Sequence, residues 1–327
     1  MSAATRINRF ALRGPARIEI NEVAPRDGLQ IEPVVVPTDA KVALLDALSD
    51  CGFARIEATS FTSARAIPAL ADAEAVMHRI RRAAGVRYTV LVPNLRGLER
   101  ALSCGPDEVN LVMSASETHN RANLRMTRAQ SQAQLLAMIE AARAANVAIN
   151  VSLSTVFGCP FEGDVDPDAV MALARIFAGA GANGITLCDT TGMAYPTQVR
   201  ALCEIFQNAL PDTALTIHLH NTRGMGLANA LAAWEAGVTR FDAAAGGLGG
   251  CPYAPGASGN VSTEELVHMF ASMGVDTGVD LQRLLAVVAG LGDVVQREVS
   301  SQLLRAGPRL ATHQPPAWLA EHFAGQA

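Results

Sequence analysis

The sequence has little of several features that define whole classes of protein. Its 327 residues contain a single lysine, Lys41, so almost all positive charge is arginine. The formal net charge of -5 argues against a protein that coats nucleic acid. The longest apolar stretches, such as Leu281–Gly292, are interrupted by polar residues and are shorter than the roughly 18 residues of a membrane-spanning helix. We therefore expect neither a nucleic acid nor a membrane as partner.

Cysteine pairs and a leader are also missing. The six cysteines are Cys51, Cys104, Cys159, Cys188, Cys203 and Cys251, and no two have the C-x-x-C spacing of a zinc ribbon. A chain that is 50% hydrophobic can build a core without disulfide bonds. The first 17 residues have no apolar run of the secretory type. These features predict a cytoplasmic protein.

What is present is a regular alternation of short β-branched runs and Ala/Leu-rich helical stretches. The predicted strands are Arg17–Val23, Arg55–Ala58, Arg87–Val92, Glu108–Met113, Ala148–Leu153, Gly184–Cys188, Leu215–His220 and Arg240–Ala244. The clearest predicted helices are Thr38–Cys51, Leu95–Ser103, Arg128–Ala145, Pro167–Ala180, Pro196–Leu210, Gly226–Ala236, Thr263–Met273 and Leu281–Val299. Eight strand–helix units, one per roughly 20 to 40 residues, predict an α/β protein with a (β/α)8 TIM barrel.

An open doubly wound sheet is the alternative fold. It would place a glycine-rich G-x-G-x-x-G turn after the first strand. The sequence there is Ala24-Pro25-Arg26-Asp27-Gly28, which does not match. No segment resembles an interdomain linker. We therefore expect residues 1–327 to form a single catalytic domain, with the barrel at about 17–275 and an extra C-terminal helical segment at about 276–327.

The sharpest chemical signal is His218-Leu219-His220. Side chains on a strand alternate with a period of two, so both imidazoles project to the same face. At the end of an inner barrel strand that face is the mouth, where catalytic groups collect. With Asp27 from strand one and Asn260 after strand eight, they form a mixed nitrogen and oxygen set that suits Mg²⁺, Mn²⁺ or Zn²⁺. The alternative is a pair of ordinary strand histidines.

Other polar residues follow the predicted strands. Cys251 comes directly after Gly249 and Gly250, in a stretch that can bring backbone amides close to a ligand and can move. Its thiol could donate or accept a proton, although a lone cysteine is more often a small apolar filler. Plausible further members of the site, or members of a salt bridge at the barrel mouth, are Arg26, Glu57 and Asp189. Surface or packing roles are expected for His78, His119, His268, His313 and His322.

Seven motifs together resemble a known family. They are Arg26-Asp27-Gly28-Leu29-Gln30, Glu57-Ala58-Thr59-Ser60-Phe61, Val92-Pro93-Asn94-Leu95, Gly158-Cys159-Pro160-Phe161-Glu162-Gly163, His218-Leu219-His220, Gly247-Leu248-Gly249-Gly250-Cys251-Pro252-Tyr253 and Gly256-Ala257-Ser258-Gly259-Asn260. From Glu22 to about Leu285 the sequence resembles the hydroxymethylglutaryl-CoA lyases, which belong to a group of metal-dependent barrel lyases and condensing enzymes.

The resemblance implies a carbon–carbon lyase. Its reaction would be retro-Claisen cleavage of 3-hydroxy-3-methylglutaryl-CoA to acetyl-CoA and acetoacetate, in leucine degradation or ketone-body formation. The implied ligands of Mg²⁺ or Mn²⁺ are Asp27, His218, His220 and Asn260. The implied catalytic residues are Arg26, which steadies the enolate, Asp27 or His218 as the base, Glu57, and Cys251 as proton donor or acceptor. The implied substrate-binding residues are Arg26, Gln30, Ser60, Asn94 and Asp189. The expected partner is an acyl-CoA, and the expected assembly is a homo-dimer or homo-tetramer.

Several positions depart from the family pattern. Pro33 stands where a lysine is common, Ser152 where a tyrosine is frequent, and Cys188 where a glycine often precedes the aspartate. Further departures are Asn221 and the segment 244–246. They keep open a lyase of the same family that acts on another 3-hydroxyacyl-CoA, such as citramalyl-CoA. A condensing synthase is less favoured, because such enzymes usually carry a separate C-terminal regulatory domain. A non-catalytic barrel is disfavoured by the intact set of ligand residues.

Overall fold

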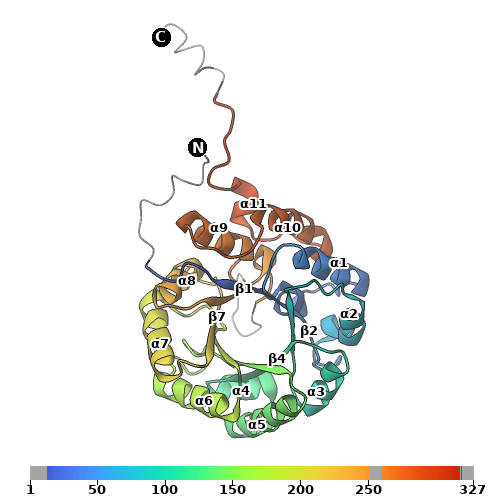
Figure 1. Cartoon of the computed structure of the whole chain (residues 1–327), viewed down its shortest axis with the longest axis vertical. Helices are drawn as coiled ribbons and strands as arrows, with labels where there is room; N and C mark the ends of the chain where they lie inside the picture. The colour runs from blue at the N-terminus through green and yellow to red at the C-terminus, as the bar shows by residue number, and fades with distance from the viewer. Residues whose placement is uncertain (1–12, 251–258, 317, 319–327) are drawn as a thin grey trace.

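The computed structural model describes residues 13–250, 259–316 and 318. Within them eight parallel strands close into a barrel in chain order, and the first strand pairs with the eighth as well as with the second. Figure 1 shows this ring of strands inside a ring of helices. The strands are β1 (Glu19–Glu22), β2 (Arg55–Ser60), β3 (Arg87–Leu91), β4 (Glu108–Ser114), β5 (Ala148–Ser154), β6 (Gly184–Asp189), β7 (Ala214–Leu219) and β8 (Arg240–Ala243). The predicted (β/α)8 barrel is confirmed.

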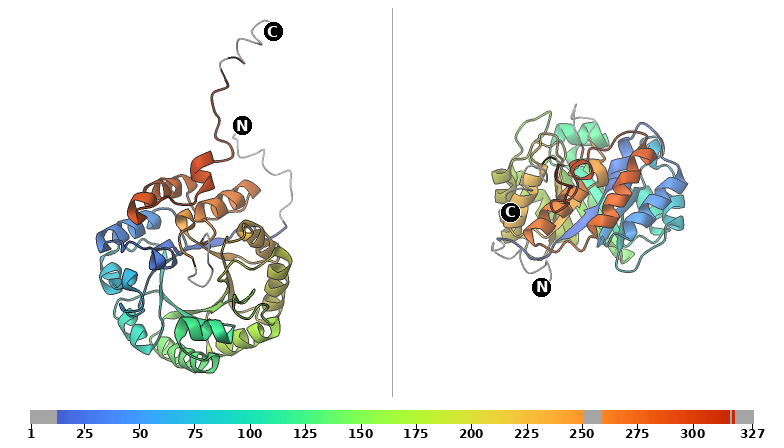
Figure 2. Two further views of the ribbon diagram at one scale, coloured as in Figure 1. Left: turned by 180° about the vertical axis from the view of Figure 1, so that it is seen from behind. Right: turned by 90° about the horizontal axis from the view of Figure 1, so that it is seen from above.

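Helices cover the outside of the barrel. They are α1 (Thr38–Ser49), α2 (Ala73–Arg79), α3 (Leu95–Leu102), α4 (Glu117–Leu124), α5 (Arg128–Ala144), α6 (Pro167–Ala180), α7 (Pro196–Ala209), α8 (Gly226–Glu235), α9 (Thr263–Met273), α10 (Leu281–Val295) and α11 (Gln302–Ala306). The last three pack together beside α1 and α8, as Figures 1 and 2 show from opposite sides. In the part of the chain that is described, none of the helices combines the length and the apolar character needed to cross a membrane.

The differences from the predicted helices are local. Helices α2, α4 and α11 were not among the clearest predicted helices, because segments of five to eight residues give little periodic pattern. The last long helix was expected to reach Val299 but ends at Val295. Gln296 adopts a left-handed backbone conformation with φ of 55°, and its N–H donates to the carbonyl of Gly292. This conformation ends the helix.

The strands have one apolar face and one polar face. Fully buried apolar side chains such as Ile20, Ile56, Ile149, Ile217 and Phe241 belong to the hydrophobic core that the helices also build. Each of them contributes about 1.5–3 kcal/mol to folding. The residues between them are polar and face the barrel axis, because strand side chains alternate. These inward-facing side chains include Asn21, Glu57, Thr89, Asn110, Asn150, Thr186, His218 and Asp242. The barrel interior is therefore polar around its whole circumference.

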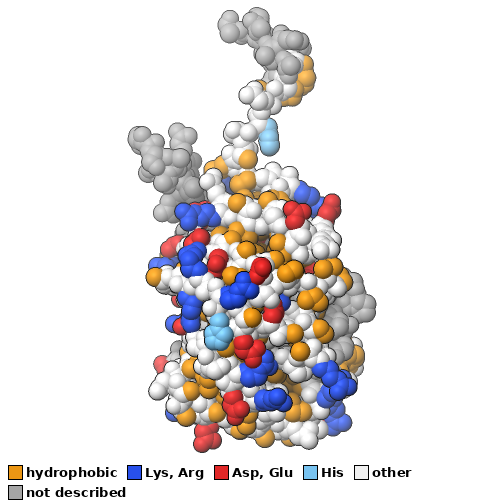
Figure 3. Space-filling model, turned by 90° about the vertical axis from the view of Figure 1, so that its right-hand side faces the viewer, with side chains coloured by type: hydrophobic (Ala, Val, Ile, Leu, Met, Phe, Trp, Pro, Cys, Tyr) orange, Lys and Arg blue, Asp and Glu red, His pale blue; other side chains and the backbone are white. Residues whose placement is uncertain are grey.

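The outer surface carries mixed charge. Figure 3 shows the face over α1 to α3, where basic and acidic side chains alternate with apolar ones. Exposed ion pairs join Arg79 to Asp39 and Arg81 to Asp50 on this side of the molecule. Such pairs contribute little stability, because water screens them. No large patch of one sign is visible on this face.

Candidate active site at the carboxyl ends of the strands

The chain leaves β1 through a π-helical turn, Ala24–Gly28, which places Arg26 and Asp27 at the mouth of the barrel. Both side chains are buried. Arg26 Nη1 donates to Asp27 Oδ1 at 2.6 Å, and Gln30 Nε2 donates to the same oxygen at 2.9 Å. Irregular turns of this kind are frequent at functional sites. A Cβ atom at Gly28 would lie 2.9 Å from Leu248 Cβ, so the turn needs glycine there.

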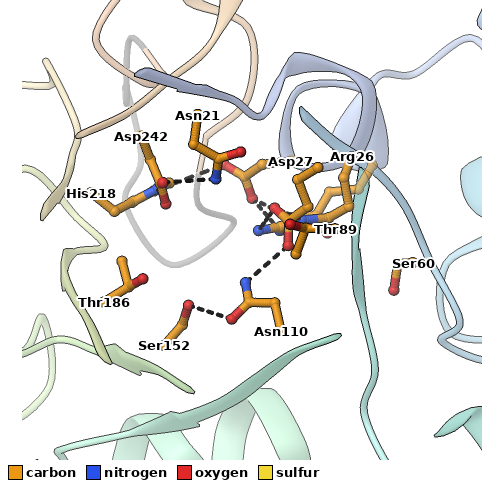
Figure 4. A network of polar contacts seen from close by, with 12 residues as sticks. Asn21, Arg26, Asp27, Ser60, Thr89, Asn110, Ser152, Thr186, His218 and Asp242 are labelled. Carbon is orange, nitrogen blue, oxygen red and sulfur yellow. Dashed lines mark hydrogen bonds and ion pairs between the residues drawn. The ribbon is translucent and has the colours of Figure 1, made fainter. Parts of the chain in front are cut away.

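Glu57 on β2 completes the surroundings of the Arg26 guanidinium. Arg26 Nε donates to Glu57 Oε2 at 2.7 Å, and Asn110 Nδ2 donates to Glu57 Oε1 at 2.9 Å (Figure 4 shows this network). The pairing of β2 with β3 shifts register directly after Glu57, as bulges near active sites often do. Burial raises the pKa of Glu57, and the charge of Arg26 opposes that effect. The two negative partners raise the pKa of Arg26 against the effect of its burial, which keeps the guanidinium charged.

His218 on β7 and His220, directly after that strand, lie on the same side, as their spacing predicts. Their ring centroids are 5.2 Å apart. His218 Nδ1 lies 3.2 Å from Asp242 Oδ2, and His218 Nε2 lies 4.0 Å from Asp27 Oδ2. A hydrogen bond from Nδ1–H to the carboxylate leaves the lone pair of Nε2 directed toward Asp27. Burial, and then the neighbouring His218, lower the pKa of His220 to about 3, so this imidazole is neutral at physiological pH.

Asn260 brings the segment after β8 into contact with the same group. Its Nδ2 donates to Asp27 Oδ2 at 2.7 Å and to the carbonyl of Leu248 at 2.9 Å. Its backbone forms a bridge with that of His220. Asn260 therefore connects to Asp27 through its side chain and to His220 through its backbone.

The residues present fit a divalent cation. One ligand atom each from Asp27, His218 and His220 lie within 4.8 Å of one another, and all three residues are buried. Among the described residues, His220 Nδ1 and Asn260 Oδ1 are buried polar atoms without a hydrogen-bond partner. Most buried polar atoms in proteins have a partner, and a bound cation would supply one to each of these two atoms, which lie beside the Asp27 carboxylate. Burial disfavours ionisation of Asp27, but the charge of Arg26 and then the neighbouring histidines lower its pKa to about 2, so its carboxylate is anionic beside the two imidazoles.

The other predicted site residues lie in different surroundings. Asn94 Oδ1 accepts the N–H of Gly97 and so caps α3. Ser60 Oγ is bonded to Thr62 Oγ1 at 2.8 Å, and Figure 4 shows Ser60 apart from His218. Asp189 Oδ1 accepts the N–H groups of Met193 and Ala194, and burial raises its pKa to about 6. These three remain predictions as substrate-binding residues. Cys251 lies outside the described residues.

Sequence reasoning missed two residues that organise the site. Asp242 is bonded to His218 and accepts the amide of Asn21 at 2.9 Å. Asn110 accepts Ser152 Oγ at 2.8 Å and Asn150 Nδ2 at 2.9 Å. The available signal was a polar side chain in the middle of a predicted buried strand, at the position that faces the barrel axis.

Two buried carboxyl groups hold the glycine stretch that precedes Cys251. Glu22 Oε1 accepts the N–H groups of Ala24 at 2.8 Å and Ala245 at 2.9 Å. Glu264 Oε2 accepts the N–H of Gly246 at 3.1 Å. Further along, Gly249 has φ of 98°, and a Cβ there would lie 2.5 Å from Asn260 Nδ2. The stretch therefore packs directly on the candidate ligand residues.

The Glu22→Gln substitution tests this buried carboxyl. Burial raises the pKa of Glu22 from 4.5 to about 7. Between these pH values the folded state keeps a proton that the unfolded state has lost, so the stability of the wild type falls as the pH rises. The loss amounts to about 3 kcal/mol. Glutamine keeps the accepting oxygen but does not titrate. We expect the variant to be more stable than the wild type at pH 8, with a smaller difference at pH 5.

Urea unfolding at pH 5, 6, 7 and 8 measures this difference. Glu140→Gln on the exposed face of α5 is the matched control and should leave the profile unchanged. A difference between Glu22→Gln and the wild type that does not vary with pH contradicts the prediction.

Comparisons of the sequence with known proteins identify relatives over most of the chain. A model of the HMGL-like family matches residues 17–290. The chain is 43% identical over 291 residues to a hydroxymethylglutaryl-CoA lyase of Bacillus subtilis, covering 89% of this chain and 97% of that protein. It is 43% identical over 301 residues to an (R)-citramalyl-CoA lyase of Chloroflexus aurantiacus, covering 89% and 95%.

Solved structures agree with the sequence comparisons. An HMG-CoA lyase of Acinetobacter baumannii, in complex with coenzyme A and 3-methylmalate, superimposes with a TM-score of 0.89 at 46% identity and covers 94% of this chain and 100% of that one. The resemblance found in the motifs is confirmed: the chain belongs to the HMGL-like family.

Proposed function

We propose that this protein is a hydroxymethylglutaryl-CoA lyase, which cleaves 3-hydroxy-3-methylglutaryl-CoA to acetyl-CoA and acetoacetate. The observation that carries the proposal is the convergence of Asp27, His218 and His220 within 4.8 Å, beside the Arg26 guanidinium. Relatives of that name are 40–43% identical over most of the chain. The reaction breaks the bond between C2 and C3 of the acyl group, and the hydroxyl on C3 becomes the ketone.

We propose that Asp27, His218, His220 and Asn260 hold Mg²⁺ or Mn²⁺. Nitrogen and oxygen donors of this kind suit such ions. When bound, the ion lowers the pKa of a coordinated hydroxyl group by stabilising its negative charge. The unpaired Oδ1 of Asn260 and the unpaired Nδ1 of His220 support this ligand set.

The hydroxyl proton must leave before the bond can break. Asp27 and His218 are the two candidate bases. Asp242 is hydrogen-bonded to Nδ1 of His218. Nε2 of the same ring can therefore accept the proton or act as a metal ligand. A positioned base of this kind contributes about 10²–10⁴-fold to the rate.

The electron pair of the broken bond moves to C2 of the departing acetyl group and gives an enolate of the thioester. Arg26 is the residue that steadies this negative charge. Glu57 and Asp27 fix its guanidinium from two sides, so the positive charge is oriented before the substrate arrives. The enolate carbon then takes up a proton. Cys251 follows Gly250 directly in the sequence, and we propose its thiol as the donor.

Other features of the chain remain predictions. Gln30, Ser60, Asn94 and Asp189 are proposed to contact the substrate. We also propose that the chain acts as a single catalytic domain, because α10 packs against α1 and α9, and α11 packs against α9 and α10. Leucine degradation, ketone-body formation and a dimer or tetramer are likewise expectations that follow from the resemblance, and a cytoplasmic location is the expectation from the cysteine pattern and the first 17 residues.

Citramalyl-CoA is the second candidate substrate. The relative from Chloroflexus aurantiacus carries that name, and the structure from Acinetobacter baumannii contains 3-methylmalate. In this chain the small side chains of Ser152 and Cys188 are buried; Ser152 Oγ donates to Asn110 Oδ1, and Cys188 on β6 is paired with His218 on β7. The cleavage chemistry is the same for both substrates, because each carries a tertiary hydroxyl on C3 of a thioester.

A substrate panel with purified protein and Mg²⁺ tests the proposal. Release of acetoacetate and acetyl-CoA from hydroxymethylglutaryl-CoA is the expected result, and EDTA should abolish it. Turnover of citramalyl-CoA alone would select the second candidate. A protein that cleaves neither thioester, or a lyase that EDTA does not affect, contradicts the proposed reaction.

The Asp242→Asn substitution tests the positioning of His218. An amide at this position can still accept the hydrogen bond of Asn21, but its NH₂ group favours a His218 tautomer with the proton on the wrong nitrogen. We expect a 10- to 100-fold loss of Mn²⁺ affinity, measured by paramagnetic resonance. Asp212→Asn on an exposed turn is the control. Unchanged Mn²⁺ affinity in Asp242→Asn contradicts this role.

A further inference from the structure

A cleft lies at the end of the barrel opposite to the candidate active site. It has a volume of about 390 Å³ and is lined by Glu19, Ala54, Arg55, Gly85, Val86, Arg87, Asp107 and Arg240. Most of these residues lie at or next to the first positions of β1, β2, β3, β4 and β8, whereas the histidines lie at the end of β7. None of them belongs to the site proposed for the cleavage reaction.

Three guanidinium groups meet around this cleft. Arg55 on β2 is paired directly with Arg87 on β3, and Arg240 on β8 is paired with Glu19 on β1. Arg55 is only 8% exposed. Like charges side by side on neighbouring strands are unfavourable, and buried arginines need partners. Glu108 forms ion pairs with both Arg55 and Arg87, with N–O distances of 2.6 Å and 3.9 Å.

The carboxylates present leave most of the N–H groups unused. Within the described chain, the only hydrogen bond made by these three guanidinium groups is from Arg55 Nη1 to Glu108. Arg240 Nε lies 3.2 Å from Glu19 as an ion pair. Asp107 is bonded to Arg82 and to a backbone N–H. Elsewhere, by contrast, Arg100 and Arg297 each donate two hydrogen bonds to a single glutamate: Glu74 and Glu32, respectively.

We propose that this cleft binds a small multivalent oxyanion of the phosphate type. The paired N–H donors of a guanidinium group fit the oxygens of phosphate. Arg87 and Arg240 lie on either side of Arg55, which is held by its hydrogen bond to Glu108. An anion there adds the acceptors that Glu19 and Glu108 do not supply. Because it binds only the folded chain, it raises the stability of the barrel by mass action.

Inorganic phosphate and pyrophosphate are the probes. Calorimetry and thermal unfolding are carried out on the full chain without substrate, with sodium chloride at equal ionic strength as the reference. We expect saturable binding of pyrophosphate and a rise in Tm beyond that of chloride. Arg87→Gln should raise the Kd about tenfold or more, because a charged donor is lost. Arg175→Gln, on the exposed face of α6, should not change it.

Two further measurements separate this site from the catalytic one. Asp27→Asn, at the other end of the barrel, should leave pyrophosphate binding unchanged, and Arg87→Gln should keep the lyase activity of the wild type. Arg240→Gln repeats the test if Arg87→Gln does not fold. The proposal fails if pyrophosphate binds no better than chloride, if Asp27→Asn abolishes pyrophosphate binding, or if Arg87→Gln and Arg175→Gln have the same Kd. These outcomes do not depend on the identity of the lyase substrate.

Discussion

Replacing Asp27 with asparagine is expected to lower kcat/KM for hydroxymethylglutaryl-CoA by about 10³-fold or more. The substitution removes the only carboxylate among the proposed ligands. A bound cation supplies several kcal/mol of transition-state stabilisation, and each loss of about 1.4 kcal/mol lowers the rate tenfold. It also leaves Arg26 with Glu57 as its single close negative partner. We therefore expect Mn²⁺ affinity and activity to fall together. Steady-state kinetics and paramagnetic resonance on the same preparation measure both quantities.

Asp39→Asn is the matched control for Asp27→Asn. Asp39 is an exposed carboxylate in an ion pair with Arg79, so its loss should leave activity and metal binding unchanged. Circular dichroism establishes whether each variant is folded. A folded Asp27→Asn protein that retains its Mn²⁺ affinity would remove Asp27 from the ligand set.

The second large effect is expected for Arg26→Lys. Lysine keeps the positive charge but not the planar fork with which Arg26 contacts Glu57 and Asp27 simultaneously. The charge is then no longer fixed where the enolate forms. We expect kcat to fall by about 10²–10³-fold, as it does when one preorganised donor is removed. Mn²⁺ affinity should change much less, because Arg26 is not a ligand.

Arg81→Lys provides the control, since its guanidinium pairs with Asp50 on the exposed surface. Separate measurement of kcat and KM distinguishes a role of Arg26 in substrate binding from a role in stabilising the enolate. A rise in KM at constant kcat would assign Arg26 to substrate binding alone, and an unchanged kcat would exclude it from stabilising the enolate.

The barrel could be predicted from the sequence because its strands repeat a simple pattern. Each of the eight predicted strands overlaps an observed one. The predicted long helices begin at the observed residues, α6 and α9 match at both ends, and the others end one to four residues earlier than predicted. The end of α10 at Val295 depends on the left-handed conformation of Gln296, which residue type alone does not indicate. Short elements such as α4 depend on their packing against the barrel.

The site was predictable in part, for a related reason. The period of two in a strand places His218 and His220 on one face, and the topology of the barrel brings Asp27 and Asn260 to the same end. The pairing of Asp242 with His218 depends on the register between β7 and β8, which sequence periodicity does not set. Likewise, the π-helical turn that aims Arg26 at Glu57 is a tertiary feature.

Titration of the wild-type protein and of His220→Ala with Mn²⁺, followed by paramagnetic resonance, tests the central claim most directly. His220 is fully buried, has an unpaired ring nitrogen and is neutral at physiological pH, so as a ligand it should contribute strongly to the affinity. The account predicts one tight site per wild-type chain and a loss of that site in His220→Ala while the fold is retained. A wild-type chain that binds no divalent cation, or a folded His220→Ala protein with the affinity of the wild type, would contradict it.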